Sequence, residues 1–335
     1  MRASIGVALF TILGCLPSAT AQTKGDRCAN LKSDREVQEC RANQAEAIKE
    51  ASELRSALQS GNGGTVANDP TAADLRYNVH MSDCENRWVA LYHKPNDHDY
   101  TYGFVYIDPQ AGFTLQYGGH FTIDSNGDYH EATNSLPANK FNLKIRLQGQ
   151  NGIAALLPPR ALARVGLPEK PDWLNFYEDK ADSVTHKVSW GFFYNDIGDP
   201  RRAIDYLESA YSEKPDAPRV VFELTFAYNA LGRPADAIRI SKSEFVRNPK
   251  DELLCREMAF AYLTLKSYKE ATEQYQACIA LLDDSEGARA EKSELAINLS
   301  AAYERMGDTQ NRDVWVKKAR DWAPEGSPVY NSFHP

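Results

Sequence analysis

Apolar and polar positions follow different periods in the two halves of this chain. From Arg87 to Leu157 the sequence alternates with a period of two, whereas after Val184 it repeats in a much longer frame. A period of two is typical of strands that bury one face. The pattern therefore predicts a β-rich first half and a separate, helical second half.

Short runs in the first half are predicted to be strands, separated by turn signals such as Asp108–Gly112 and Asn126-Gly127. Because such short connections join antiparallel neighbours, we expect a small antiparallel meander. Asn126-Gly127 is typical of a two-residue type I′ turn, which would place His130 opposite Ile123. The predicted strands are Arg87–His93, Tyr100–Ile107, Phe113–Tyr117, His120–Ile123, Tyr129–Thr133, Phe141–Leu147 and Ile153–Leu157.

One predicted strand carries aromatic residues on a single face, namely Tyr100, Tyr102, Phe104 and Tyr106. An aromatic face of this kind can be half of a hydrophobic core, here covered by a helix from the N-terminal region. It can also stack on the sugar rings of a glycan. We favour the core and keep a cell-envelope glycan-binding or glycan-processing role as the alternative function.

Before this region, Ser33–Ser60 has the composition of one helix with a weak apolar stripe, and Ser33 and Glu36 form a capping-box pattern. Gly61–Gly64 ends this helix and begins a linker to about Leu75. After the strands, Pro158–Asp182 is expected to connect to the second half, with Trp173, Phe176 and Tyr177 packing on its first outer helix.

Four tyrosines of the second half share one frame, and the first three are equally spaced along the chain. An alanine follows each of these three at a constant offset, and prolines close three of the four units. A fixed period of this kind indicates a solenoid of stacked repeats. The framing residues are Tyr194, Tyr228, Tyr262 and Tyr303, then Ala203, Ala237 and Ala271, then Pro215, Pro249 and Pro324.

This frame resembles the tetratricopeptide repeat, a helix-turn-helix unit whose period of about 34 residues matches the tyrosine spacing. Units from Val184, Pro218 and Glu252 run without a gap, and a fourth starts near Ser293 after a short insertion around Glu286–Lys292. The resemblance covers the C-terminal half and implies an α-solenoid of about four helix pairs. With the N-terminal helix and the antiparallel β-domain, the predicted fold class is α+β.

The resemblance further implies that the first helix of each unit lines a concave groove. Phe192, Phe226 and Phe260 would form an aromatic stripe there, and Asn195 and Asn229 could bond to an extended peptide. We therefore expect a protein or peptide partner in the groove. The alternative, left open by the residues, is that these side chains pack between repeats or beneath the chain's own first half. The candidate groove residues are Val188, Phe192, Asn195, Phe222, Phe226, Asn229, Arg256, Phe260 and Leu263.

The predicted organisation follows from these elements. The segments are a signal peptide (1–21), an N-terminal helix with linker (22–75), the β-domain (76–160), a connector (161–183), the solenoid (184–325) and a C-terminal tail (326–335).

Met1–Ala21 has the features of a signal peptide: Arg2, the apolar segment Ile5–Leu16 and the small residues Ala19–Ala21. It predicts export to the periplasm or medium by a bacterial-type leader. The sequence ending at Cys15 also resembles a lipoprotein signal, so an outer-membrane lipid anchor at this cysteine is the alternative. No later segment approaches the roughly 20 apolar residues that cross a bilayer.

After the leader the chain retains Cys28, Cys40, Cys84, Cys255 and Cys278. An oxidising compartment favours disulfides between well-placed cysteines. Cys255 and Cys278 fall near opposite ends of one antiparallel helix pair, so we predict a disulfide between them, with two buried thiols as the alternative. The pairing of the other three stays open.

Candidate chemistry beyond binding is sparse. Asp124, Asn126 and Asp128 have alternating oxygen ligands, but Gly127 and Ser135 do not fit the calcium-loop pattern. The sequence shows no nucleophile elbow, phosphate-binding glycine loop or metal-ligand set, so we predict no cofactor or metal. A net charge of −8 argues against nonspecific nucleic-acid binding. The sequence thus favours an adaptor over an enzyme.

Overall fold

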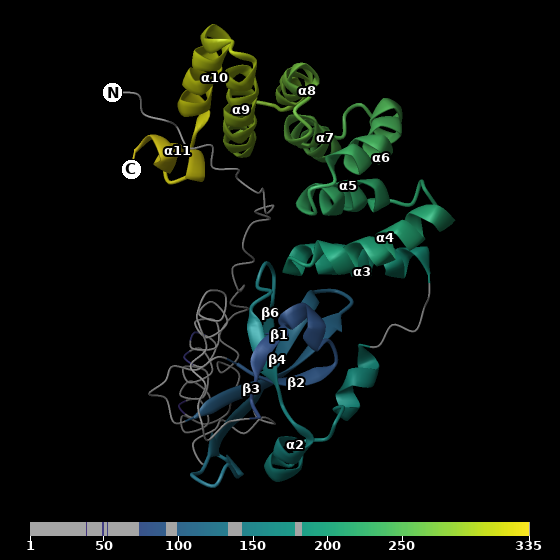
Figure 1. The fold of residues 1–335 in the computed structure, drawn as a ribbon, viewed down its shortest axis with the longest axis vertical. Coiled ribbons are helices and arrows are strands. Elements are labelled where there is room, and N and C mark those ends of the chain that lie inside the picture. Colours follow the sequence, from purple (N-terminus) through teal and green to yellow (C-terminus); the bar gives the residue numbers. More distant parts are fainter. Residues whose placement is uncertain are drawn as a thin grey trace. The chain divides into compact units, whose positions relative to one another are not determined.

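The computed structural model describes residues 74–91, 99–132, 143–177 and 183–334, together with the single helical positions Gln38, Lys49 and Ser52 (Figure 1). The described residues divide into a β unit before the repeats and a helical unit containing them, with Asp196–Asp199 grouped with the β unit. The predicted leader, Cys28, Cys40 and nearly all of the predicted Ser33–Ser60 helix lie outside the described residues.

The β unit contains one antiparallel sheet with the strand order β1-β7-β2-β3-β4-β5, and β6 pairs with β4. The antiparallel sheet was predicted correctly. Its elements are β1 (Tyr77–His80), the 3-10 helix η2 (Met81–Cys84), β2 (Arg87–Ala90), β3 (Tyr100–Asp108), β4 (Gly112–Ile123), β5 (Tyr129–Glu131), β6 (Lys144–Arg146), β7 (Ile153–Leu156), helix α2 (Pro159–Val165) and the 3-10 helix η3 (Asp172–Phe176).

The predicted meander is correct only from β2 to β5. Strand β7 returns to lie between β1 and β2, with Ile153 opposite His80 and Ala155 opposite Ala90. Strand β1 was not predicted at all. It pairs with a segment from the far end of the β unit, which short connections and local alternation cannot reveal.

Strand β4 joins two predicted strands into one. The register with β3 shifts between Tyr102, opposite Gly119, and Gly103, opposite Tyr117, so Gly118 is an extra residue that forms a bulge. A Cβ atom on Gly118 would lie 2.3 Å from the Tyr102 ring. Glycine is therefore required where this ring lies against the backbone.

The turn between β4 and β5 has a three-residue loop, not the predicted two-residue type I′ loop. The Gly127 amide donates to the Asp124 carbonyl (2.9 Å), and Gly127 takes a φ of 80°. This is the geometry of a type I turn followed by a left-handed glycine. The register consequently moves by one residue, and His130 pairs with Thr122 instead of Ile123.

The aromatic face of β3 is buried inside the β unit. Tyr100, Tyr102, Phe104 and Tyr106 are at most 4% exposed. Connector residues cover the part of this face formed by Phe104 and Tyr106: the ring centroids of Trp173 and Phe104 lie 5.6 Å apart, and those of Tyr177 and Tyr106 lie 4.8 Å apart. The expectation that the connector aromatics pack on the first outer helix is therefore wrong for Trp173 and Tyr177. Phe176 is exposed.

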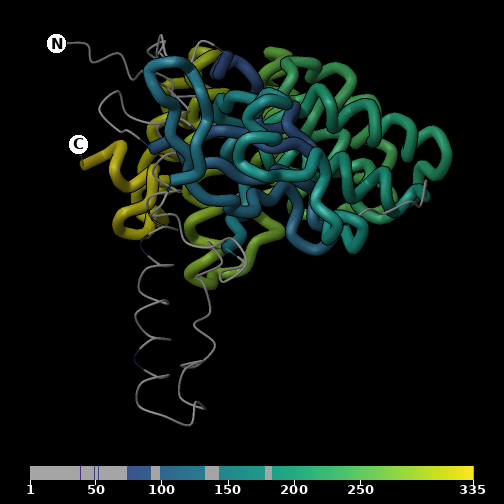
Figure 2. The backbone as a smooth tube through the Cα atoms, turned by 90° about the horizontal axis from the view of Figure 1, so that it is seen from below, coloured from purple at the N-terminus to yellow at the C-terminus, as the bar shows by residue number. Residues whose placement is uncertain are grey.

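The helical unit consists of successive antiparallel helices that stack in chain order (Figure 1), and the tube trace of Figure 2 follows them from teal to yellow. Four pairs are present in the described residues, as predicted. They are α3 (Val184–Ile197) with α4 (Pro200–Glu213), α5 (Val220–Ala230) with α6 (Pro234–Arg247), α7 (Glu252–Thr264) with α8 (Tyr268–Leu281), and α9 (Glu286–Met306) with α10 (Thr309–Trp322), followed by α11 (Pro328–Phe333).

Small residues set the close approach of the paired helices. Ala203, Ala237 and Ala271 are fully buried, as their place in the repeat frame suggested. A Cβ atom on Gly191 would lie 2.4 Å from Leu207 Cγ, so α3 and α4 approach closely because this position has no side chain.

The fourth pair differs from its prediction at both ends. The residues predicted as an insertion, Glu286–Lys292, are helical and form the first turns of α9. The predicted C-terminal tail contains α11, whose Val329 packs with Ala296 and Ala319 over the end of the array. No helix among the described residues has the length and apolar character needed to span a bilayer.

Candidate functional site on the inner helices

Six of the nine predicted groove residues are partly buried side chains on the first helices of three pairs, α3, α5 and α7. We define the inner-helix face as Phe192 of α3, Phe222 and Phe226 of α5, and Arg256, Phe260 and Leu263 of α7. All six side chains are partly buried. Rings fixed on one side and accessible on the other are suited to contact another molecule.

Three predicted groove positions lie inside the array instead. Val188, Asn195 and Asn229 are at most 9% exposed. Val188 belongs to an apolar cluster that includes Val220 and Leu254, so it packs between repeats. These three residues do not form part of an open surface.

The two asparagines are used in a hydrogen-bond pattern that repeats along the array. Asn195 Nδ2 donates to the carbonyl oxygen (3.0 Å) and carboxylate Oε2 (3.1 Å) of Glu223 in the next repeat. Asn229 Nδ2 donates to the same two groups of Glu257, at 2.9 Å and 3.0 Å. The Oδ1 atoms of both amides are buried without a hydrogen-bond partner. Each asparagine side chain therefore joins its own repeat to the next repeat by hydrogen bonds.

The glutamates in this pattern were missed at the level of sequence. Glu223 and Glu257 are 2% and 5% exposed, although glutamate is rarely buried. A signal was present, because Glu223, Glu257 and Glu291 recur at the same interval as the framing tyrosines. A charged residue recurring inside an apolar frame is a sign of a structural contact.

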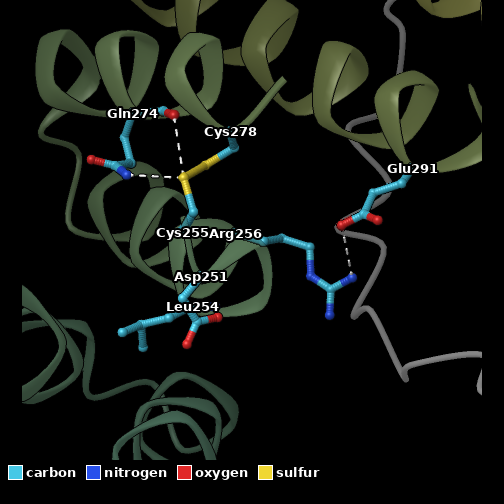
Figure 3. The surroundings of a disulfide bond; sticks show 7 residues. All are labelled: Asp251, Leu254, Cys255, Arg256, Gln274, Cys278 and Glu291. Carbon is cyan, nitrogen blue, oxygen red and sulfur yellow. Dashed lines mark hydrogen bonds and ion pairs between the residues drawn. A yellow bond between two sulfur atoms is a disulfide. The ribbon is translucent and has the colours of Figure 1, made fainter. Parts of the chain in front are cut away.

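An acidic cluster surrounds Arg256 at the α7–α9 contact; we define it as Glu257, Glu291 and Glu294. Arg256 Nε lies 3.9 Å from Glu257 Oε1. Arg256 Nη1 lies 3.5 Å from Glu291 Oε1, a contact drawn in Figure 3. Burial raises the pKa of all three carboxyl groups, and Arg256 opposes this shift. One guanidinium therefore lies near three carboxyl groups, so the cluster contains more acidic than basic side chains.

Arg219 makes a corresponding contact one repeat earlier. Its guanidinium carbon lies 4.6 Å from the centre of the Phe192 ring, and its Nη2 lies 2.6 Å from Glu223 Oε1. The Arg219 side chain is 57% exposed and the Glu223 side chain 3%. Arg219 therefore forms an ion pair with one carboxylate, that of Glu223, whereas Arg256 lies near several acidic side chains.

A disulfide joins Cys255 of α7 to Cys278 of α8, the pair predicted from the sequence (Figure 3). Both cysteines are buried, and Gln274 Nε2 lies 3.1 Å from Cys255 Sγ. Cys255 directly precedes Arg256, so the bond also fixes the backbone that presents this cation. Cys84 is a buried thiol that donates to the His80 carbonyl (3.2 Å).

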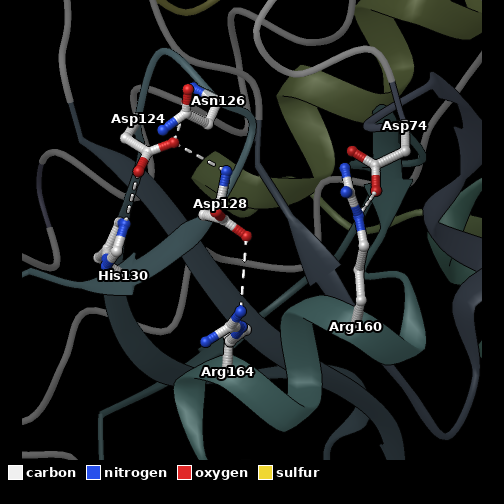
Figure 4. Close-up of polar contacts among 7 residues, drawn as sticks. All are labelled: Asp74, Asp124, Asn126, Asp128, His130, Arg160 and Arg164. Atoms are coloured by element: carbon white, nitrogen blue, oxygen red, sulfur yellow. Dashed lines mark hydrogen bonds and ion pairs between the residues drawn. The ribbon is translucent and has the colours of Figure 1, made fainter.

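In the β unit, acidic side chains are held in local polar contacts (Figure 4). The Asp124 carboxylate accepts hydrogen bonds from the backbone N–H groups of Asn126 and Asp128. Its Oδ2 atom lies 3.1 Å from His130 Nε2. Asp74 accepts from Arg160 Nε at 2.5 Å. Among the described residues, no group of three or more His, Cys, Asp or Glu side chains is placed to hold a metal ion.

Residues 197–242 match a family model described as tetratricopeptide repeat. The solved structures similar to this chain include MamA MSR-1 (20% identity, TM-score 0.39, covering 49% of this chain and 85% of that one). Another is MamA 41-end from Desulfovibrio magneticus RS-1 (14% identity, TM-score 0.39, 45% and 80% coverage). Comparison with curated proteins finds no match. The C-terminal half of this chain thus contains a tetratricopeptide-repeat match at residues 197–242, within four consecutive antiparallel helix pairs.

Proposed function

We propose that this protein is an exported adaptor that holds a protein or peptide partner on the inner-helix face. Tetratricopeptide repeats indicate a protein-interaction role. The observation that supports this particular surface is the recurrence of Phe192, Phe226 and Phe260 at the repeat period, each partly buried. Aromatic anchors in a row suit a partner segment laid along successive repeats.

The buried asparagines change how such a partner is held. Because Asn195 and Asn229 bind the next repeat through their amide nitrogens, those nitrogens are not available to a peptide backbone. The partner's contacts in this proposal are therefore mainly apolar, made with the phenylalanine rings and Leu263.

The test is capture of a partner by the full chain and by a Phe192→Ala/Phe226→Ala/Phe260→Ala variant. Proteins retained from envelope extract are identified, purified and rebound to the chain in a titration. We expect the triple variant to lose the partner while keeping the circular-dichroism spectrum of the wild type.

A matched control is Val246→Ala/Leu265→Ala/Val314→Ala, which removes exposed apolar side chains outside the inner-helix face. It should bind like the wild type. Equal binding by both triple variants would show that the partner is held elsewhere.

Export is the second part of the proposal. It is supported by the leader pattern of Met1–Ala21 and agrees with the Cys255–Cys278 disulfide, since such bonds persist in oxidising compartments. Intact mass measurement of the protein from a bacterial host is the test. A chain starting at Gln22 supports plain export, a lipid-modified Cys15 supports the outer-membrane alternative, and an unprocessed chain in the cytoplasm contradicts both.

The glycan alternative depended on an accessible aromatic face of β3. All four aromatic residues of this face are buried within the β unit, with Phe104 and Tyr106 against Trp173 and Tyr177, so they offer no stacking surface. We do not retain it.

A further inference from the structure

We propose that the partner segment on the inner-helix face is basic as well as apolar, with a lysine or arginine paired to the acidic cluster beside Phe260. This inference rests on the proposed adaptor function and deepens it by stating the chemistry of the partner. The occupant is a protein segment in which cationic residues lie next to aliphatic or aromatic ones.

The first support is the charge balance where α7 meets α9. Three carboxyl groups lie near Arg256, and Glu252 is a further acidic neighbour of Glu291. No ion pair within the described residues reaches Glu294, although its side chain is partly buried. A cation brought by a partner would favour the ionised form of these carboxyl groups and pair with it.

The second support is the partial exposure of the acidic cluster. The Glu291 side chain is 26% exposed and Glu294 is partly buried, so a partner can reach both carboxyl groups. An ammonium or guanidinium group of the partner can therefore donate charge-assisted hydrogen bonds to them.

The third support is that the acidic cluster and the phenylalanine side chains of the inner-helix face lie next to each other. Arg256 and Phe260 are four residues apart on α7, so they lie on the same side of the helix. The acidic cluster is therefore next to the aromatic stripe. One segment with a cation near an apolar residue can contact both.

The experiment uses the full chain and two fluorescent peptides of the same length. One alternates leucine with lysine, and the other has glutamate in place of each lysine. We expect the lysine peptide to bind and the glutamate peptide not to bind. In a Glu291→Gln/Glu294→Gln variant, affinity for the lysine peptide should fall about tenfold, the effect of losing about 1.4 kcal/mol.

The control is Glu270→Gln/Glu273→Gln, which removes the same formal charge from exposed positions of the outer helix α8. It should change affinity by less than about twofold, as expected for exposed charges. If both double variants weaken binding equally, the attraction comes from the acidic chain in general and the inference is wrong. Equal binding of the two peptides also overturns it.

Failure of this inference can be told apart from failure of the adaptor proposal. If the captured partner is lost from the triple phenylalanine variant but binds Glu291→Gln/Glu294→Gln normally, the adaptor proposal stands and the basic chemistry is wrong. If the triple variant keeps the partner, both proposals fail.

Discussion

Single residues on the inner helices take roles that their repeat positions alone do not specify. Phe192 and Asn195 lie one turn apart on α3, yet the ring stays partly accessible while the amide is buried against Glu223. The difference comes from the partner that each side chain meets in the next repeat.

The Asn229 amide is predicted to stabilise the array. Asn229→Ala removes two hydrogen bonds from the buried Glu257, one to its carbonyl and one to its carboxylate. We expect the free energy of unfolding to fall by about 1–3 kcal/mol, because a buried acceptor loses its donor. Urea unfolding followed by circular dichroism measures this. The control is Asn248→Ala, at an exposed position after α6, which should change the free energy of unfolding little. A similar loss of stability in both variants would contradict a stabilising role of the Asn229–Glu257 hydrogen bonds.

Glu257 makes stability depend on pH. Burial raises its pKa above the ordinary value of 4.5, so the folded chain holds the proton more tightly than the unfolded chain. The stabilisation from this proton is complete below pH 4.5 and is lost as the pH rises through the raised pKa. Glu257→Gln, which resembles the protonated form, should therefore lose less stability than the wild type between about pH 5 and about pH 7.5. Urea unfolding at both pH values tests this, and parallel behaviour of the two chains would argue against it.

Elements pack in the helical unit through contacts between small and large residues at fixed repeat positions. The α3–α4 contact depends on Gly191, and the α7–α8 contact is joined by the disulfide. These two contacts can be tested separately because they lie in different repeats.

Gly191→Ala should separate α3 from α4. The added methyl group would overlap Leu207, and we expect a loss of about 1–3 kcal/mol in the free energy of unfolding despite the higher helix propensity of alanine. Gly287→Ala in α9 is the matched control, since a Cβ atom there meets nothing within 4 Å. It should leave stability unchanged or raise it by up to about 1 kcal/mol. Loss of stability in both variants would mean that helix packing is not the cause.

The Cys255–Cys278 bond should stabilise the third repeat. It closes a loop with a sequence separation of 23 residues, so Cys255→Ala/Cys278→Ala is expected to lower the free energy of unfolding by about 2–4 kcal/mol. Thermal unfolding with and without a thiol reductant provides the measurement. Reductant should destabilise the wild type and leave the double variant unaffected; a wild type insensitive to reductant would contradict a stabilising bond.

At the scale of the whole molecule, the two units differ in how their contacts depend on chain separation. In the helical unit, α4 to α10 each contact the next helix in the sequence. In the β unit, β1 and β2 both pair with β7, which is far from them in the chain. Sequence periodicity therefore predicts the arrangement of the helical unit much better than that of the β unit.

The sequence by itself determined the repeat architecture, because Tyr194, Tyr228 and Tyr262 recur with the length of one helix pair and each pair meets its neighbour in chain order. It also indicated the Cys255–Cys278 pair and the aromatic strand. Only the tertiary structure decided that β7 inserts beside β1, that the connector buries the aromatic face, and that Asn229 binds Glu257 instead of facing outward. The physical reason is that periodicity records which residues share a face, whereas burial and hydrogen bonding depend on the segment that covers that face.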